Sequence, residues 1–201
     1  ILQLRLHPSI IALKNKVESE LKSKKTKYEI DLTYITSRGR WYDISWKGDQ
    51  SKSGGVATNI GVHFFDMLHW IFGPLVEQKV HVRSHDRASG VLFFKNAKVR
   101  WFLSINAATL PENVVQSGGR IHRSLRFDQW SFDFTEGFTE LHSRSYAHIL
   151  NENGFTERDA QPAISIVHGM RESLLSALDS EAHPFASLPQ DPHPFYPVKN
   201  T

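Results

Sequence analysis

Cysteine is absent from this chain of 201 residues, and its absence removes several kinds of chemistry. Disulfide bonds, thiolate zinc sites, iron–sulfur clusters and cysteine nucleophiles all need the missing thiol. This composition is compatible with the cytoplasm, which is where we expect the protein. Two glycine-rich loops are also missing, since neither G-x-G-x-x-G nor G-x-x-x-x-G-K-[ST] occurs. We therefore expect this chain by itself to bind no nucleotide cofactor.

A long hydrophobic run is missing as well. The most apolar stretch, residues 60–72, contains His63, Asp66 and His69. It is too short for a bilayer, which needs about 20 apolar residues. We expect no membrane partner. No signal peptide is visible either, and the chain begins at Ile1, so we expect it to be the remainder of something longer.

The chain carries little excess charge of one sign, with 24 Lys and Arg against 21 Asp and Glu. Residues 1–27 hold seven cations and two carboxylates, a local charge of +5, so the remainder is −2. This excess follows one amphipathic segment, where a solvated helix face is the usual cause. Nucleic-acid surfaces combine such charge with stacking aromatic residues or a groove-reading helix, which residues 9–27 lack. We therefore expect no nucleic-acid partner.

The residue patterns predict an α+β fold: an open, mainly antiparallel sheet with helices on one face. Gly54-Gly55 and Gly73-Pro74 bound the second expected helix, and the segment at 37–53 shows no period. Helices are predicted at 9–22, 57–72, 139–151 and 162–178, and strands at 28–36, 78–83, 89–94, 98–105, 124–128 and 131–135. The predicted domain covers residues 1–182. The tail at 183–201 is rich in proline between 183 and 197, so we expect it to lack regular structure and to lie on the surface or be mobile.

Three polar residues stand out within the apolar second helix. Asn59, His63 and Asp66 are spaced by four and three residues, which places them on one helical face. A carboxylate beside a histidine makes it a good general base. Two other interpretations stay open at this point. The His–Asp pair could be a satisfied hydrogen bond of the core, or His63, Asp66 and His69 could hold a metal, although His69 lies about 240° around the helix from His63.

Residues 54–66 (GGVATNIGVHFFD), followed by Gly73, resemble the G-G-x-x-x-D-x-G-x-H-x-x-D…G signature of the glucose–fructose oxidoreductase/inositol dehydrogenase family. Residues 3–8 (QLRLHP) resemble the segment that follows the family's Rossmann domain. The resemblance implies that this chain is the C-terminal substrate domain, and that the Rossmann domain with its E-K-P lysine is absent from it. It also implies NAD as cofactor and His63 as the base that takes a hydroxyl proton.

One position departs from the family pattern, since Asn59 stands where most members have Asp. An amide exchanges no proton at neutral pH, so it can orient a hydroxyl but cannot relay its proton. A second resemblance covers residues 35–42, 45–49, 52–55 and 137–146, which are similar to the branch that oxidises UDP-N-acetylglucosaminuronate (UDP-GlcNAcA) at the sugar 3-position. In that branch Asn at this position is normal. The branch implies a role in bacterial lipopolysaccharide O-antigen synthesis.

This substrate is anionic, so we expect cationic side chains among the residues that bind it. Arginine suits carboxylate and phosphate groups. The predicted substrate-binding residues are Asn59, Arg38, Arg40, Tyr42, Lys52, His142 and Tyr146, with Asp66 supporting the catalytic His63. Lys47 is a further cation, and Trp41 and Trp46 are candidates for stacking. Ordinary packing of the aromatic residues and solvation of the cations are the alternatives.

The sequence thus predicts the substrate domain of an NAD-dependent sugar-nucleotide 3-dehydrogenase that binds no metal. The implied partners are a UDP-sugar, the Rossmann domain of the complete chain, and further copies of the chain across the open sheet, which carries Trp101 and Phe102. Two other functions stay open: a dehydrogenase of the same family that acts on another sugar or cyclitol, and a non-enzymatic module for sugar-nucleotide binding or assembly.

Overall fold

The computed structural model describes residues 2–23, 27–127, 130–134 and 138–195. Its strands are β1 (Tyr28–Thr36), β2 (Leu75–Arg83), β3 (Arg87–Phe94), β4 (Ala97–Ser104), β5 (Ile121–Phe127) and β6 (Ser131–Asp133). Its α-helices are α1 (Pro8–Ser23), α2 (Trp41–Ile44), α3 (Gln50–Ser53), α4 (Gly55–Asn59), α5 (Gly61–Phe72), α6 (Glu112–Gln116), α7 (Leu141–Leu150) and α8 (Glu157–Glu172). Short 3-10 helices form at η1 (Gln3–Leu6), η2 (Ala107–Thr109) and η3 (Pro184–Ser187).

The described strands form one open sheet in the order β2-β3-β4-β1-β5-β6. β1 runs parallel to β4, and every other neighbouring pair is antiparallel. This confirms the prediction of a mainly antiparallel open sheet. β1 lies between the β3–β4 hairpin and the β5–β6 hairpin, and α2 to α5 with strands β2 and β3 separate it in the chain from its parallel neighbour β4.

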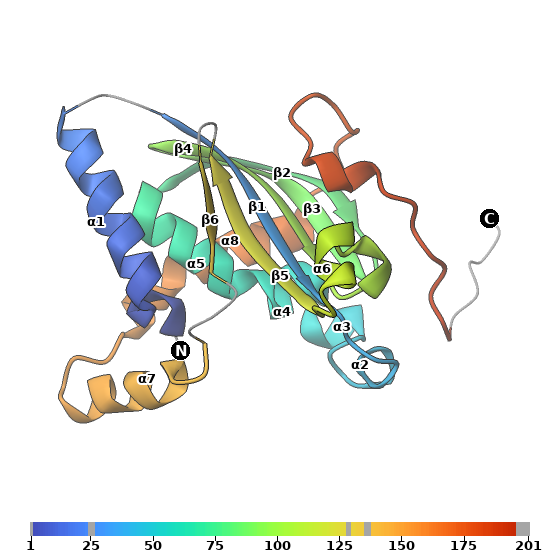
Figure 1. Ribbon diagram of the computed structural model, residues 1–201, viewed down its shortest axis with the longest axis horizontal. Helices are drawn as coiled ribbons and strands as arrows, with labels where there is room; N and C mark the ends of the chain where they lie inside the picture. The colour runs from blue at the N-terminus through green and yellow to red at the C-terminus, as the bar shows by residue number, and fades with distance from the viewer. Residues whose placement is uncertain (1, 24–26, 128–129, 135–137, 196–201) are drawn as a thin grey trace.

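Helices α1, α4, α5 and α8 cover one face of the sheet, and the C-terminal segment runs over the other (Figure 1). Because strand side chains alternate, Ile30, Leu32 and Tyr34 of β1 point to the helices. Trp101 of β4 lies on the same face, with its ring 5.2 Å from that of Phe65 of α5. The core is therefore continuous between the middle of the sheet and α5, the helix that carries His63.

The second predicted helix is divided in two. α4 ends at Asn59, and α5 begins at Gly61, with Ile60 between them at φ −107° and ψ −46°. Gly61 packs so tightly that a Cβ there would lie 2.6 Å from Phe65 and 2.8 Å from Leu103. Spacing along the sequence could not reveal this break, because it depends on how closely the chain approaches β4.

The fourth predicted helix, at 162–178, is wrong at both ends. α8 begins with a capping box between Thr156 and Asp159 and ends at Glu172. Arg83 donates hydrogen bonds to the carbonyls of Met170 and Arg171 in the last turn of the helix. The chain then becomes extended along the edge of β2, where the Ser176 N–H donates to the Val80 carbonyl. The unperiodic segment at 37–53 also differs from expectation, since it contains the single-turn helices α2 and α3.

The described part of the proline-rich tail packs on the outer face of the sheet. His183 is 3% exposed, stacks on Phe102 and hydrogen-bonds Thr33 through Nε2 at 3.0 Å. The buried guanidinium of Arg87 donates to the carbonyls of Leu188 and Pro189. The tail thus lies on the surface of the sheet as expected, but η3 gives it a turn of regular structure that its proline content did not predict.

Candidate active site

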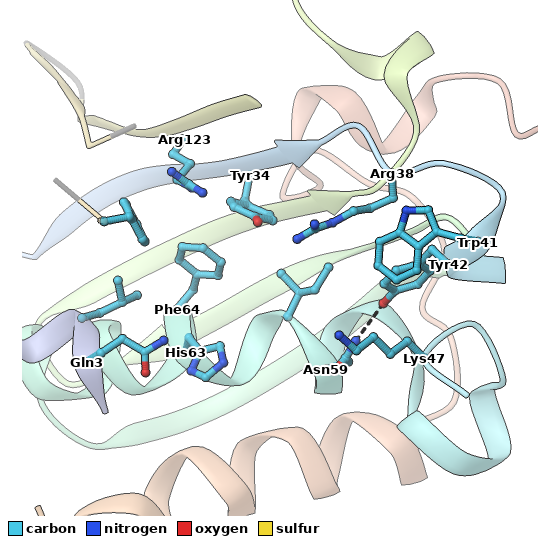
Figure 2. Close-up of a pocket in the computed structure, with 13 residues that line it drawn as sticks. Gln3, Tyr34, Arg38, Trp41, Tyr42, Lys47, Asn59, His63, Phe64 and Arg123 are labelled. Carbon is cyan, nitrogen blue, oxygen red and sulfur yellow. Dashed lines mark hydrogen bonds between the residues drawn. The ribbon is translucent and has the colours of Figure 1, made fainter. Parts of the chain in front are cut away.

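A cavity of about 320 Å³ opens where η1, β1, the segment after β1 and the α4–α5 junction meet. We call it the His63 cavity. Figure 2 shows its lining residues, which are Gln3, Leu4, Tyr34, Arg38, Trp41, Tyr42, Lys47, Asn59, Ile60, His63, Phe64, Arg123 and Phe138. Its size is at the lower end of the range for small-molecule sites. The structure therefore brings together Arg38, Tyr42, Asn59 and His63 from the predicted set.

His63 lies in the first turn of α5, with its ring on the cavity wall. Burial lowers the pKa of this imidazole below its usual value, because a charged ring would lose solvation there. The charge of Asp66 acts in the opposite direction and raises it. None of the hydrogen bonds among the described residues uses the His63 ring. The ring is therefore neutral near pH 7 and can accept a proton from a ligand.

Asn59 and Tyr42 form a hydrogen-bonded pair on the same wall. The Asn59 amide Nδ2 donates to the Tyr42 hydroxyl at 2.9 Å, as the dashed line in Figure 2 marks. Tyr42 is only 3% exposed, and burial raises the pKa of its hydroxyl. Asn59 comes from the end of α4 and Tyr42 from α2, so this bond ties the segment after β1 to the α4–α5 junction.

Positive charge dominates the cavity. Arg38, Lys47 and Arg123 line it, and none of its thirteen described lining residues carries a carboxylate. The Lys47 ammonium lies 5.9 Å from the centre of the Trp41 ring and 6.0 Å from that of Trp46. Arg123 lies 3.9 Å above the Phe138 ring. Such a set of side chains favours an anionic ligand with a flat group.

Asp66 has a different partner from the one its spacing predicted. Its carboxylate accepts hydrogen bonds from Arg5 at 2.7 and 3.0 Å, and Arg5 also reaches Asp159 of α8 at 3.3 Å. Arg5 is 6% exposed and Asp66 1%. No hydrogen bond among the described residues joins Asp66 to His63, so Asp66 acts on His63 through its charge in this structure. The pair fixes η1, and therefore Gln3 and Leu4, against the cavity.

Four predicted residues do not line the His63 cavity. Arg40 borders a separate hollow beside Asp86 and Asp191, and the exposed Lys52 pairs with Asp49 at 3.3 Å. His142 and Tyr146 lie on α7, where Tyr146 is 61% exposed. His142 is near enough for its charge to lower the pKa of His63. For these four residues substrate contact stays a prediction.

Sequence reasoning missed several cavity residues, of which Arg123 and Tyr34 are the most informative. The two are opposite each other in the β1–β5 pairing. Arg123, Leu125 and Phe127 alternate along β5, so a cation shares a strand face with two apolar core residues. That pattern is a usable signal. The sequence around Gln3 contains no such signal, because only the fold of η1 brings this residue to the cavity.

The structure offers no support for a metal site at His63, Asp66 and His69. In the part of the chain that it describes, no three or more His, Asp or Glu residues are arranged to hold a metal ion. Asp66 is paired with Arg5, while His69 keeps a buried Nδ1 without a partner. Within the same described residues, no helix is long and apolar enough to cross a membrane.

Residues 26–122 match the family model described as "Oxidoreductase family, C-terminal alpha/beta domain". The chain contains the C-terminal α/β domain of this oxidoreductase family. The matched residues include β1, the His63 helix and strands β2 to β4. The resemblance that residues 54–66 carried is thereby confirmed.

The chain is also similar to solved dehydrogenases. The WlbA (WbpB) dehydrogenase from Thermus thermophilus, solved with NAD and alpha-ketoglutarate, shares 44% identity at a TM-score of 0.85. The alignment covers 92% of this chain and 59% of that one. A second structure of the Thermus enzyme, with NAD and UDP-GlcNAcA, shares 42% identity at the same TM-score and coverage. The WlbA dehydrogenase from Bordetella pertussis shares 18% identity at a TM-score of 0.58, with 84% of this chain and 57% of that one covered, and supports the fold alone.

Proposed function

We propose that this chain is the substrate domain of an NAD-dependent dehydrogenase that oxidises the 3-hydroxyl of a UDP-GlcNAcA-type sugar nucleotide. The observation that carries the proposal is a neutral, partly buried histidine in a cavity with three cations and no carboxylate among its described lining residues. The similarity to the Thermus WlbA dehydrogenase, solved with UDP-GlcNAcA, supports the substrate class. Because the chain spans 59% of that relative's length, activity and substrate are proposals for the whole protein.

His63 supplies the proton chemistry. Oxidation of a secondary alcohol to a ketone removes the O–H proton and transfers the hydride of the adjacent C–H bond to an acceptor. The neutral imidazole takes the proton, and its low pKa keeps the ring in the accepting form near pH 7. The Asn59 amide and the Tyr42 hydroxyl lie on the same wall and position the sugar hydroxyls.

The cations bind the charged parts of the substrate. A UDP-uronate carries a carboxylate and two phosphates, which guanidinium groups bind through paired hydrogen bonds. Arg38 is held at the cavity because its backbone N–H donates to the Ile105 carbonyl at 3.0 Å. The exposed rings of Trp41 and Trp46 flank Lys47 and offer stacking surfaces for the base.

NAD, when bound, supplies the hydride acceptor. The residues of this chain would contribute only a minor part of the NAD site. The chain has no glycine-rich phosphate loop, and its cavity suits the sugar. His63 is the residue that must lie beside the reacting carbon. The dinucleotide itself is held by a Rossmann domain outside this chain.

We base the proposed pathway, cellular compartment and oligomeric state on the same resemblance. We place the enzyme in bacterial lipopolysaccharide O-antigen biosynthesis, in the cytoplasm, as a homo-oligomer that uses the outer face of the sheet. Asp31, Arg100 and Arg126 form an ion-pair cluster there, next to the area that the tail covers. Trp101, expected to need a partner copy, is instead covered by α5, and Phe102 by His183 and Phe185.

Alpha-ketoglutarate is a second candidate ligand of this cavity. The Thermus relative was solved with it, and a dicarboxylate suits the same three cations. As a 2-oxo acid it would accept a hydride at its carbonyl carbon and a proton from protonated His63, which reverses the sugar chemistry and regenerates oxidised cofactor. Competition with UDP-GlcNAcA for the cavity tests this: simultaneous, independent binding of both would refute it.

The main test is turnover by the full-length protein. We expect NADH formation with UDP-GlcNAcA and little with UDP-GlcNAc, which has the same diphosphate but no sugar carboxylate, or with inositol. Arg38→Ala should raise KM for UDP-GlcNAcA, whereas Arg144→Ala on the exposed face of α7 serves as the matched control. Equal activity with a cyclitol would support the other family dehydrogenase. Binding of UDP-GlcNAcA without any NADH formation would support a non-enzymatic module.

A further inference from the structure

The hydrogen bond between Asn59 and Tyr42 has a direction. The amide Nδ2 is the donor and the Tyr42 hydroxyl oxygen is the acceptor, 2.9 Å apart. A phenol has one hydrogen to donate, and this bond does not use it. Among the hydrogen bonds of the described residues, none has the Tyr42 hydroxyl as donor. That hydrogen is therefore available to a ligand in the cavity that Tyr42 lines.

A carboxylate at position 59 would reverse this arrangement. An ionised aspartate only accepts hydrogen bonds, so it would take the Tyr42 hydrogen for itself. It would also place a negative charge in a cavity where Arg38, Lys47 and Arg123 are the charged side chains. A sugar carboxylate at Tyr42 would then lose one hydrogen-bond donor and be repelled by the new charge, whereas a sugar without a carboxylate would lose only the donor.

We propose that Asn59 is a positioning residue that holds the Tyr42 hydroxyl as a donor toward the ligand, and that this polarity selects an acidic sugar over a neutral one. The inference rests on the proposed function, because the ligand is taken to be the UDP-sugar. Tyr42 makes the contact and Asn59 acts through it. The burial of Tyr42, at 3% exposure, leaves its ring little freedom to find another arrangement.

The test compares two ligands with Asn59→Asp, a substitution of nearly equal shape. Binding of UDP-GlcNAcA and UDP-GlcNAc is measured by calorimetry on the wild-type protein, Asn59→Asp, Tyr42→Phe and the double variant. Asn113→Asp, at an exposed position of α6, adds the same charge away from the cavity and is the matched control. Circular dichroism and the thermal midpoint show that each variant is folded.

For Asn59→Asp we expect affinity for UDP-GlcNAcA to fall at least about tenfold, and affinity for UDP-GlcNAc to fall much less. In the Tyr42→Phe background the same substitution should cost clearly less, because the donor it captures is gone. The loss should shrink as the pH is lowered and the introduced carboxylate is protonated. The other titratable and charged groups around the site are the same in the variant and the wild type, so the ratio of their affinities isolates the effect of position 59. These groups are Arg38, Lys47, Tyr34, Asp43, His63 and Arg123.

Two outcomes separate this inference from the function on which it rests. If wild-type protein binds neither sugar, the proposed substrate is wrong. If wild-type protein binds UDP-GlcNAcA and Asn59→Asp changes both ligands equally, or loses the same affinity in the Tyr42→Phe background, Asn59 does not act through Tyr42. Should Asn59→Asp fail to fold, Tyr42→Phe alone decides: it must weaken the binding of UDP-GlcNAcA more than the binding of UDP-GlcNAc.

Discussion

The buried ion pair between Arg5 and Asp66 allows a stability prediction that also separates two roles for Asp66. Arg5 is 6% exposed, Asp66 is 1% exposed, and two hydrogen bonds of 2.7 and 3.0 Å join them. In Asp66→Asn the guanidinium stays buried but loses its buried counter-charge, and only the more exposed Asp159 remains as an acidic partner. Removing one partner of a buried pair costs about 3–5 kcal/mol of the free energy of unfolding. For a domain of this size that is a large part of the total stability.

Urea unfolding followed by tryptophan fluorescence measures the loss. With a slope of about 2–3 kcal/mol per molar urea, the midpoint should fall by roughly 1–2 M. Glu18→Gln removes one partner of the exposed i,i+4 pair with Lys14 and should change stability by less than about 0.5 kcal/mol. Replacing both buried partners, as Arg5→Met with Asp66→Leu, should recover much of the loss, because no unpaired charge remains.

The reasoning fails if Asp66→Asn shifts the urea midpoint no more than Glu18→Gln. If the full-length protein then loses turnover while its stability is unchanged, Asp66 serves His63 directly. The structure argues against that result, because Asp66 is hydrogen-bonded to Arg5 and, among the described residues, not to His63.

Three further predictions concern His63 and His183, whose pKa values are both lowered by burial. His63→Asn should lower turnover of the full-length protein at least about 100-fold while UDP-GlcNAcA still binds; normal turnover would contradict its role as base. Because burial lowers the pKa of His63 from 6.5, the acid limb of the turnover profile should lie below pH 6.5, and a limb at pH 7 or above would be inconsistent with the structure. Burial lowers the pKa of His183 to about 4, so the unfolded chain binds its proton first as the pH falls. The stability that neutral His183 contributes is complete above pH 6.5, and about 3 kcal/mol of it should be lost by pH 4. Urea midpoints measured across this range for wild type and His183→Asn should converge at the acid end; parallel curves would contradict the assignment.

Local sequence patterns were sufficient for most of the fold. The alternation at 28–36 predicted β1 with its observed bounds, and the apolar spacing after Pro8 predicted α1 to within a residue at each end. Both signals depend on which residues face the core, and that face repeats along the chain. The glycine–His motif at 54–66 was sufficient to identify the family, because it combines glycines that the backbone conformation needs with the imidazole of His63.

The tertiary structure decided which polar groups meet. Spacing placed Asn59, His63 and Asp66 on one helical face, yet the break at Ile60 and the arrival of distant residues gave each a different environment. Asn59 pairs with Tyr42, Asp66 pairs with Arg5 at a separation of 61 residues, and His63 alone keeps its ring for the cavity.

The missing cysteines and glycine-rich loops excluded whole classes of chemistry from the sequence alone, since a residue that is not in the chain supplies no group to any site. The cavity was different, because Gln3 on η1 and Arg123 on β5 are far apart in the chain and line the same cavity only through the packing of sheet and helices. Residue identity fixed the chemistry that was available, and long-range packing decided which side chains share the site.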